Sequence, residues 1–145
     1  LALPNYLEFM ENNYNIIEQI GEGTFSTVYA AQCKKTGAYL AIKCITKTSA
    51  PSRVLDELTI IKKLEGRNNC IHLLRVERSG DQILAVFPLV KGMDFKDFIV
   101  HCSLRDIRTY MYNLIRALAH VHANGIIHRD LKPSNFIYDM DSESG

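Results

Sequence analysis

Apolar residues in the first part of the chain fall in short β-like segments bounded by turn residues. Such segments are typical of strands that bury one face. They predict strands over Tyr14–Ile20, Phe25–Gln32, Tyr39–Ile45, Ile71–Glu77 and Gln82–Phe87. Because the first three are joined by short turns that contain glycine, we expect neighbouring strands to run antiparallel. A five-stranded antiparallel sheet is therefore predicted before residue 88.

One helix interrupts the predicted strands. Pro51 stands where a first helical turn tolerates a missing N–H, and Ser49 is a possible cap for that turn. Gly66 would end the helix. Apolar residues repeat between them at helical spacing: Val54, Leu55, Leu58, Ile61 and Leu64. The first part of the chain thus combines a sheet with one helix.

A second predicted helix dominates the chain after residue 92. Ser103 and Asp106 fit a capping box, and Asn124-Gly125 marks the end of the helix. Its apolar stripe comprises Leu104, Ile107, Met111, Leu114, Ile115, Leu118 and Val121. These patterns divide the chain into an N-terminal approach segment (1–13), a strand-rich part (14–87), a connector (88–92) and a helical part (93–145). The predicted fold class is α+β.

Composition indicates a single globular domain. The chain has 145 residues, of which 47% are hydrophobic and 23% are charged. Its 17 basic and 16 acidic residues nearly balance, which gives no signal for direct nucleic-acid binding or for an anionic membrane. No apolar run approaches the roughly 18 residues of a membrane span, and the four cysteines lack metal-site spacing. We expect a soluble intracellular protein with reduced thiols.

The stretch from His128 to Asn135 reads HRDLKPSN, and its polar residues suit phosphoryl transfer. That reaction requires positioning and charge neutralisation more than covalent chemistry. Asp130 would accept the proton of an attacking hydroxyl, Lys132 would reach the γ-phosphate, and Asn135 would hold Mg²⁺. The alternative is a polar loop in which Asp130 only caps neighbouring backbone.

A candidate phosphate-binding turn lies between the first two predicted strands. Residues Gly21 to Val28 read GEGTFSTV, which satisfies G-x-G and has Ser26 where a third glycine is usual. Small residues let the backbone approach phosphates and donate N–H groups to them. A strand follows the turn, whereas a dinucleotide-binding fingerprint opens a helix. Taken alone, the pattern also fits an ordinary hairpin.

Lys43 and Glu57 form a candidate ion pair. Lys43 ends an Ala-Ile-Lys sequence on the third strand, where its ammonium would bind the α- and β-phosphates. Glu57 shares the inward stripe of the following helix, so it is preferred over Asp56 as the carboxylate that fixes this ammonium. A surface lysine and a solvated glutamate are the alternatives.

Together, these motifs resemble the eukaryotic protein kinase domain over about residues 14–138. Lys132, two residues after Asp130, indicates the Ser/Thr type. Within that superfamily the chain is similar to the cell-division-cycle-seven kinase family. The supporting stretches are Ile20–Tyr29, Thr48–Arg53 and Gly125–Phe136, with the Phe87-Pro88 step. A casein-kinase-like or cyclin-dependent-like kinase is the nearest competing assignment.

The resemblance implies a protein-kinase-like fold, in which an N-lobe sheet precedes a hinge and the first helical part of an incomplete C-lobe. It implies ATP and Mg²⁺ as cofactors, with Lys43, Glu57, Asp130 and Lys132 as catalytic residues and Asn135 as a metal ligand. Phe87 would be the gatekeeper. The implied ATP-binding residues are Ile20, Gly21, Glu22, Gly23, Thr24, Phe25, Ser26, Val28, Ala41, Lys43, Phe87, Pro88, Leu89 and Val90.

The same resemblance implies transfer of the ATP γ-phosphoryl group to Ser or Thr hydroxyls of proteins. It further implies a role in the cell cycle and in the initiation of DNA replication, a nuclear location, and an activating regulatory subunit.

No Asp-Phe-Gly element follows Asn135, and the near match at Asp94-Phe95-Lys96 precedes the catalytic loop and lacks the glycine. We therefore expect a truncated kinase domain with weak or absent turnover and an uncovered apolar stripe on the second helix. The alternative is a non-catalytic fragment that binds nucleotide or sequesters a partner.

Overall fold

The computed structural model describes residues 5–46 and 51–139. The chain divides into two compact units. The sheet unit comprises Leu1–Lys62 and Ile71–Leu89, and the helical unit comprises Lys63–Cys70 and Val90–Gly145. The predicted cap Ser49 lies outside the described residues.

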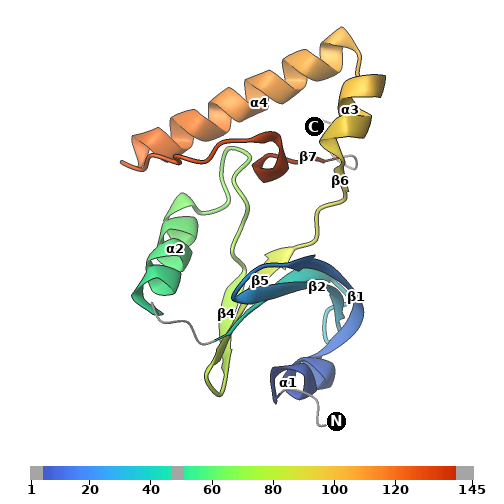
Figure 1. The fold of residues 1–145 in the computed structure, drawn as a ribbon, viewed down its shortest axis with the longest axis vertical. Coiled ribbons are helices and arrows are strands. Elements are labelled where there is room, and N and C mark those ends of the chain that lie inside the picture. The colour runs from blue at the N-terminus through green and yellow to red at the C-terminus, as the bar shows by residue number, and fades with distance from the viewer. Residues whose placement is uncertain (1–4, 47–50, 140–145) are drawn as a thin grey trace. The chain divides into compact units, whose positions relative to one another are not determined.

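The sheet unit contains the five-stranded antiparallel sheet that the sequence predicts (Figure 1). Its strands are β1 (Tyr14–Glu22), β2 (Ser26–Cys33), β3 (Tyr39–Ile45), β4 (Arg75–Ser79) and β5 (Gln82–Pro88). Their order in the sheet is β1-β2-β3-β5-β4, so β1 and β4 are the edge strands. The prediction of β3 is confirmed to the residue.

The fourth strand begins at Arg75 and not at Ile71, as its apolar pattern had indicated. Leu73 is buried in a cluster with Leu58 of helix α2 (Pro51–Leu64) and Ala85 of β5. The apolar segment before Arg75 therefore packs against a helix and does not pair as a strand. Hydrophobic periodicity alone does not distinguish these two uses of an apolar segment.

Alternate residues of β5 face two separate apolar clusters. Leu84 and Val86 belong to a cluster that includes Met10, whereas Ala85 packs with α2 residues. Successive side chains of a strand point to opposite faces. One face of the sheet therefore packs against helix α1 (Asn5–Asn13), and the other carries α2.

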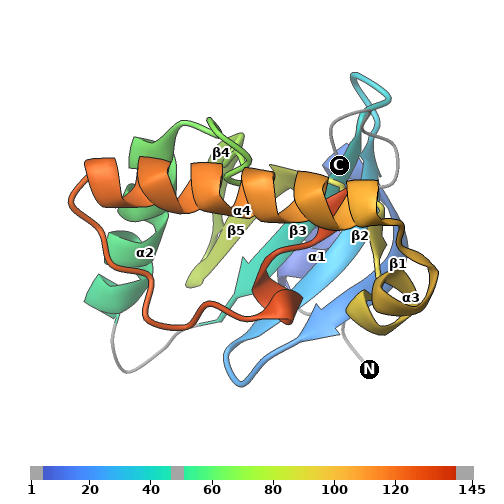
Figure 2. The same cartoon turned by 90° about the horizontal axis from the view of Figure 1, so that it is seen from above.

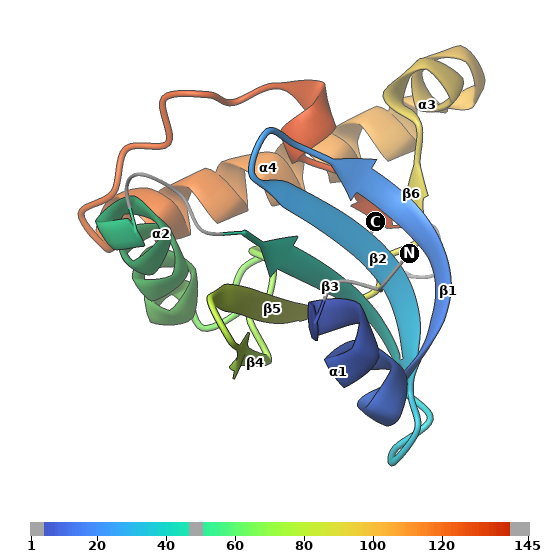
Figure 3. The same cartoon turned by 60° about the horizontal axis from the view of Figure 1, so that its bottom comes forward.

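Helix α1 occupies a segment for which the sequence predicted no element. Figure 2 and Figure 3 show it beside the sheet. Met10 is fully buried, and its sulfur accepts a hydrogen bond from the Cys44 thiol of β3 at 3.3 Å. Asn13 donates its side-chain N–H to the Phe9 carbonyl at the end of the helix (3.1 Å). Met10 therefore joins α1 to the same core cluster as Ile42 and Cys44 of β3.

The helical unit is built on α4 (Leu104–Ala123), which α3 (Phe95–His101) precedes. The chain after α4 returns alongside that helix through the 3₁₀ turn η1 (Pro133–Asn135) (Figure 1, Figure 2). The Tyr110 hydroxyl of α4 donates to the Phe136 carbonyl at 3.3 Å. A two-stranded ladder of β6 (Gly92–Met93) and β7 (Tyr138–Asp139) completes the unit.

The capping box predicted for α4 is confirmed. The Ser103 hydroxyl accepts the Asp106 N–H at 3.1 Å, and the Asp106 carboxylate accepts the Ser103 N–H at 2.8 Å. Two orphan donors at the helix start are thereby satisfied. The apolar stripe expected to be uncovered is largely exposed, at Leu104, Ile107, Met111 and Ile115. No helix within the described ranges is long and apolar enough to cross a membrane.

The connection after α2 contains an unusual run of left-handed backbone. Glu65, Gly66, Asn68 and Asn69 have φ angles of 56°, 63°, 53° and 66°. Side chains of α4 hold this connection within the helical unit. Arg116 donates to the Asn68 side-chain oxygen at 2.9 Å, and His120 Nε2 lies 2.9 Å from the Leu64 carbonyl oxygen.

Candidate active site

The glycine-containing turn closes the β1–β2 hairpin of the sheet unit. The Gly23 N–H donates to the Ser26 carbonyl at 2.7 Å. A Cβ atom on Gly23 would lie 3.1 Å from the Ser26 hydroxyl oxygen, so the turn favours glycine at this position. Thr24 and Phe25 at its tip are exposed, as are Ile20 and Glu22. The turn thus offers accessible backbone between two paired strands, as a phosphate-binding loop requires.

Strand register places several predicted ATP-binding residues on one face of the sheet. Val28 of β2 is paired with Lys43 of β3, and Ala41 of β3 is paired with Phe87 of β5. Directly paired residues share a face. Ala41 and Lys43 also alternate with Leu40, Ile42 and Cys44, which face the α1 cluster. The predicted base-contacting and phosphate-contacting residues therefore lie together on the face that also carries α2.

The structure brings Lys43 and Glu57 together. Lys43 Nζ lies 3.7 Å from a Glu57 carboxylate oxygen. The helical phase that selected Glu57 over Asp56 therefore places a carboxylate beside the strand lysine. The two side chains remain 34% and 64% exposed, so the pair contributes at most about 1 kcal/mol to stability. Its value would lie in orienting the ammonium.

The predicted hinge begins at the end of β5. Pro88 is paired with Leu40, so the strand extends one residue past the predicted Phe87. A proline is tolerated there because it ends the strand. The Leu89 N–H donates to the Tyr39 carbonyl at 3.3 Å. Val90 lies within the predicted hinge and is the first hinge residue that belongs to the helical unit, and it is exposed.

The helical unit brings Asp130, Lys132 and Asn135 into one cluster. Lys132 Nζ lies 3.3 Å from a carboxylate oxygen of Asp130. The Asn135 side-chain N–H donates to the Asp130 backbone carbonyl at 2.8 Å, which spans the loop. His128 Nδ1 accepts the Asp130 N–H at 3.1 Å. The Asp130 carboxylate and the Lys132 ammonium are exposed. Hydrogen bonds from Asn135 and to His128 restrain the backbone of Asp130.

Arg129 has a φ of 69°, in the left-handed region that residues with a Cβ avoid. Strain of this kind costs on the order of 1–3 kcal/mol and is concentrated at functional sites. The sequence motif identified Arg129 but gave no sign of its backbone conformation.

The donor set of this loop fits a hard divalent cation such as Mg²⁺. Because the Asn135 N–H₂ group donates to the loop backbone, its amide oxygen is left to accept from solvent or a cation, which fits the predicted role of Asn135 as a metal ligand. Mg²⁺ is commonly bound by only one or two such protein ligands together with substrate phosphates. The described parts of the chain hold no cluster of three or more His, Cys, Asp or Glu that suits a metal.

Two residues near the site have roles that the motifs did not reveal. Asp94, in the near match to Asp-Phe-Gly, caps α3, because its carboxylate accepts the Lys96 N–H at 2.9 Å. Gly92 lies so close to Ile137 that an added Cβ would meet a methyl carbon at 1.8 Å. A glycine in Lys-Gly-Met carries no local signal for this contact, which depends on the β6–β7 pairing.

Comparison with known proteins agrees with this arrangement. Residues 14–144 match the protein kinase domain family. The chain is 50% identical to "Probable cell division control protein 7 homolog 2" of Encephalitozoon cuniculi over 97% of the chain and 40% of that protein. It is 34% identical to "Cell cycle serine/threonine-protein kinase hsk1" of Schizosaccharomyces pombe, over 94% and 33%. It is 37% identical to "Cell division cycle 7-related protein kinase" of Mus musculus, over 88% and 23%.

The chain thus spans less than half the length of these relatives. The expected resemblance to protein kinases, and to the cell-division-cycle-seven kinases among them, is confirmed. The sheet, the predicted hinge and the predicted catalytic loop follow one another in that order within the matched residues. By its matched residues and its fold, the chain belongs to the protein kinase domain family.

Proposed function

We propose that this protein transfers the γ-phosphoryl group of ATP to Ser or Thr hydroxyls of protein substrates. The observation that carries the proposal is the cluster of Asp130, Lys132 and Asn135, whose side chains combine a proton acceptor, a cation and an oxygen ligand within one loop. Loose phosphoryl-transfer transition states need such positioned charge.

Each residue of this loop has one role in the proposed reaction. Asp130 accepts the proton of the attacking hydroxyl as its oxygen bonds to the γ-phosphorus and the bond from that phosphorus to the ADP oxygen breaks, which releases ADP. Lys132, 3.3 Å from that carboxylate, neutralises charge on the transferred group. Asn135 holds the loop through the Asp130 carbonyl and presents its amide oxygen to Mg²⁺. The cation, when bound, neutralises phosphate charge.

Residues of the sheet unit bind the nucleotide in this proposal. Backbone N–H groups of the turn at residues 21–26 donate to phosphate oxygens. Lys43, oriented by Glu57 at 3.7 Å, contacts the α- and β-phosphates. Val28 and Ala41 contact the base, whose polar edge is bound by the hinge backbone. The remaining predicted ATP-binding residues are Ile20, Phe87, Pro88, Leu89 and Val90.

We further infer a cell-cycle role, in which the substrates act in the initiation of DNA replication in the nucleus and a regulatory subunit activates the kinase. This inference is supported by relatives whose names are those of cell division cycle and cell cycle kinases. Coexpression of the whole protein with such a subunit tests it, and failure to bind or respond would count against the subfamily.

A nucleotide titration of the chain tests the kinase proposal. We expect ATP with Mg²⁺ to bind the unmodified chain, and Lys43→Met to weaken binding by about tenfold or more, since a charge-assisted contact is lost. Lys35→Met is the matched control, because this exposed lysine lies in the β2–β3 turn. Equal affinities of the two variants would refute the role of Lys43.

The transfer step is tested separately with Asp130→Asn. This variant should bind ATP normally but lose any transfer to a test protein by roughly 10²–10⁴-fold, as removal of a general base does. Binding without transfer in the whole protein would favour a non-catalytic nucleotide-binding role. Robust transfer by Asp130→Asn would contradict the proposed base.

A further inference from the structure

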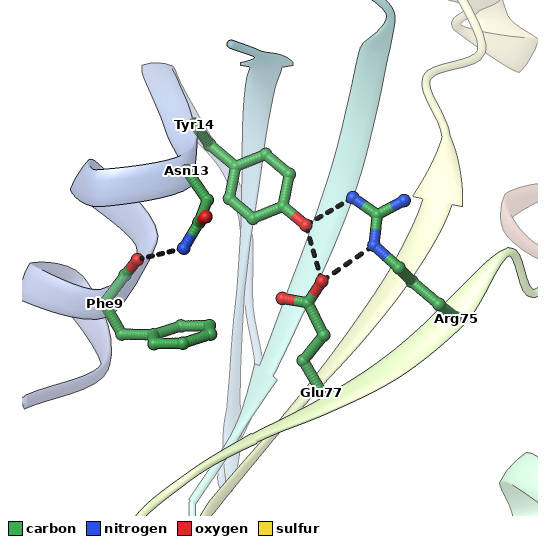
Figure 4. A network of polar contacts seen from close by, with 5 residues as sticks. All are labelled: Phe9, Asn13, Tyr14, Arg75 and Glu77. Carbon is green, nitrogen blue, oxygen red and sulfur yellow. Dashed lines mark hydrogen bonds and ion pairs between the residues drawn. The ribbon is translucent and has the colours of Figure 1, made fainter. Parts of the chain in front are cut away.

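A polar network joins the first residue of β1 to β4, within the sheet unit (Figure 4). The Tyr14 hydroxyl donates to a carboxylate oxygen of Glu77 at 2.9 Å and accepts a hydrogen bond from the Arg75 guanidinium. Arg75 Nε also donates to the same Glu77 oxygen at 2.7 Å. The Arg75 guanidinium carbon lies 5.5 Å from the centre of the Tyr14 ring. Tyr14 is almost fully buried (2% exposed).

This network connects the two opposite edges of the sheet. The strand order β1-β2-β3-β5-β4 puts four inter-strand steps between Tyr14 and Glu77. At about 4.8 Å per step, these strands would be about 19 Å apart in a flat sheet. A tyrosine and a glutamate reaching toward each other cannot bridge that distance. The sheet must therefore curl toward this face, beyond the twist that any sheet has, and the network closes the curl.

The network lies at the end of the sheet from which the hinge leaves. Tyr14 is paired with Cys33 at the end of β2, and Arg75 is paired with Val86 near the end of β5. Leu40 and Pro88 are paired at the same end. Because side chains alternate, Ala41 and Phe87 lie on the opposite face of these same strand ends. Curvature fixed on one face thus sets the shape of the proposed nucleotide face.

The three side chains depend on one another. The Tyr14 hydroxyl is protonated at neutral pH and can donate, and burial raises its pKa still further from neutrality. The second carboxylate oxygen of Glu77 is buried and has no hydrogen-bond partner among the described residues. The charge of Glu77 is therefore compensated through the oxygen that Tyr14 and Arg75 share. Loss of either contact leaves a half-buried carboxylate (its side chain 24% exposed) poorly satisfied, which is costly.

We propose that Tyr14 is a positioning residue, whose hydroxyl latches β1 to β4 through Glu77 and Arg75 and thereby holds the hinge end of β3 and β5 in the shape that binds nucleotide. This proposal rests on the proposed function for its consequence on ATP binding. This latch, the set of hydrogen bonds among Tyr14, Glu77 and Arg75, affects ATP binding only by fixing the curvature of the sheet. Tyr14 itself need not contact ATP.

Amide hydrogen exchange of the chain, measured by NMR for Tyr14→Phe, tests the latch. The variant keeps the ring and removes the hydroxyl. We expect the Leu74 and Leu89 amides, which donate to Val86 and Tyr39 at the hinge end, to exchange about tenfold faster. The Thr46 amide, bonded to Phe25 at the other end of β3, should change less than about twofold. Uniform acceleration, or none, would overturn the latch.

A nucleotide titration with the same variant tests its functional consequence. We expect ATP affinity to fall about three- to tenfold in Tyr14→Phe, and to fall likewise in Glu77→Gln, which removes the charge at the centre of the network. Tyr39→Phe is the control, because it deletes the hydroxyl of an exposed tyrosine at the same end of the sheet. It should change neither exchange nor affinity.

These outcomes separate the two proposals. Faster hinge-end exchange with unchanged ATP affinity would overturn the positioning role and leave a purely structural contact. An unmodified chain that binds no ATP would refute the proposed function, and the exchange pattern would still decide for or against the latch.

Discussion

Gly92, the last residue of the predicted hinge, offers a sharp test of how closely β6 and β7 are packed in the helical unit. Gly92→Ala adds one methyl group, whose carbon would lie 1.8 Å from Ile137 Cγ2 and 3.2 Å from Ile137 Cβ. Ile137 is 55% exposed, so its side chain can turn away at a cost of about 0.5–1.5 kcal/mol. Turning does not move its Cβ, and the β6–β7 pairing restrains the backbone. We therefore expect a loss of about 1–3 kcal/mol, the usual range for overpacking.

Urea unfolding followed by circular dichroism measures this loss, with Gly21→Ala as the control. At Gly21 the nearest atoms to an added Cβ lie at an ordinary contact distance of 3.5 Å, so that variant should be neutral within about 0.5 kcal/mol or slightly stabilised. Combining Gly92→Ala with Ile137→Ala should recover about 1 kcal/mol or more, because the clashing methyl is gone. The predicted clash with Ile137 would be refuted if Gly92→Ala left the free energy of unfolding unchanged. It would also be refuted if the double variant were no more stable than Gly92→Ala.

Three further predictions concern the core and the helix caps. Burial raises the pKa of the Cys44 thiol from 9.0 to about 12. The free energy of unfolding should therefore be unaffected by this thiol below pH 9 and should fall as the pH rises toward 12, by about 1.4 kcal/mol at pH 10. When urea unfolding is compared at pH 8 and pH 10, Cys44→Ala should lack the part of the decrease that this thiol causes. Met10→Ala should lower the free energy of unfolding by about 2–5 kcal/mol, whereas Glu8→Ala on the exposed face of α1 should change it little in the same assay. Ser103→Ala should cost about 1 kcal/mol at pH 7, and equal unfolding midpoints at pH 7 would contradict the cap. The Ser103 N–H and the Ser103 hydroxyl both lower the pKa of Asp106. Only the hydroxyl, which donates to the Asp106 carboxylate at 2.7 Å, is lost in the variant, so acid should remove part of the difference.

Sequence patterns predicted the elements whose signals are local. The limits of β3 and the capped start of α4 follow from alternation and from a capping box within a few residues. Glu57 was selected over Asp56 by helical phase alone, and the structure places it beside Lys43. Such features need no knowledge of distant parts of the chain.

Features that depend on distant contacts were missed. Met10 stabilises α1 only because Cys44 and its neighbours offer a surface to cover, and nothing within the helix indicates that surface. The contact of Tyr14 with Glu77 joins residues that are 63 positions apart. The two-residue strands β6 and β7 are too short for any periodicity, and only their pairing defines them. In the site, the motifs named the loop residues, but the tight approach of Gly92 required the fold.

The left-handed backbone after α2 has a consequence for protein chemistry. At Glu65, Asn68 and Asn69, positive φ angles are unfavourable for an L-residue and favourable for its mirror image. A chain assembled by chemical ligation should therefore accept D-amino acids at these three positions without loss of backbone stability. One position earlier, at Leu64, the same inversion of chirality would disrupt the last turn of a right-handed helix.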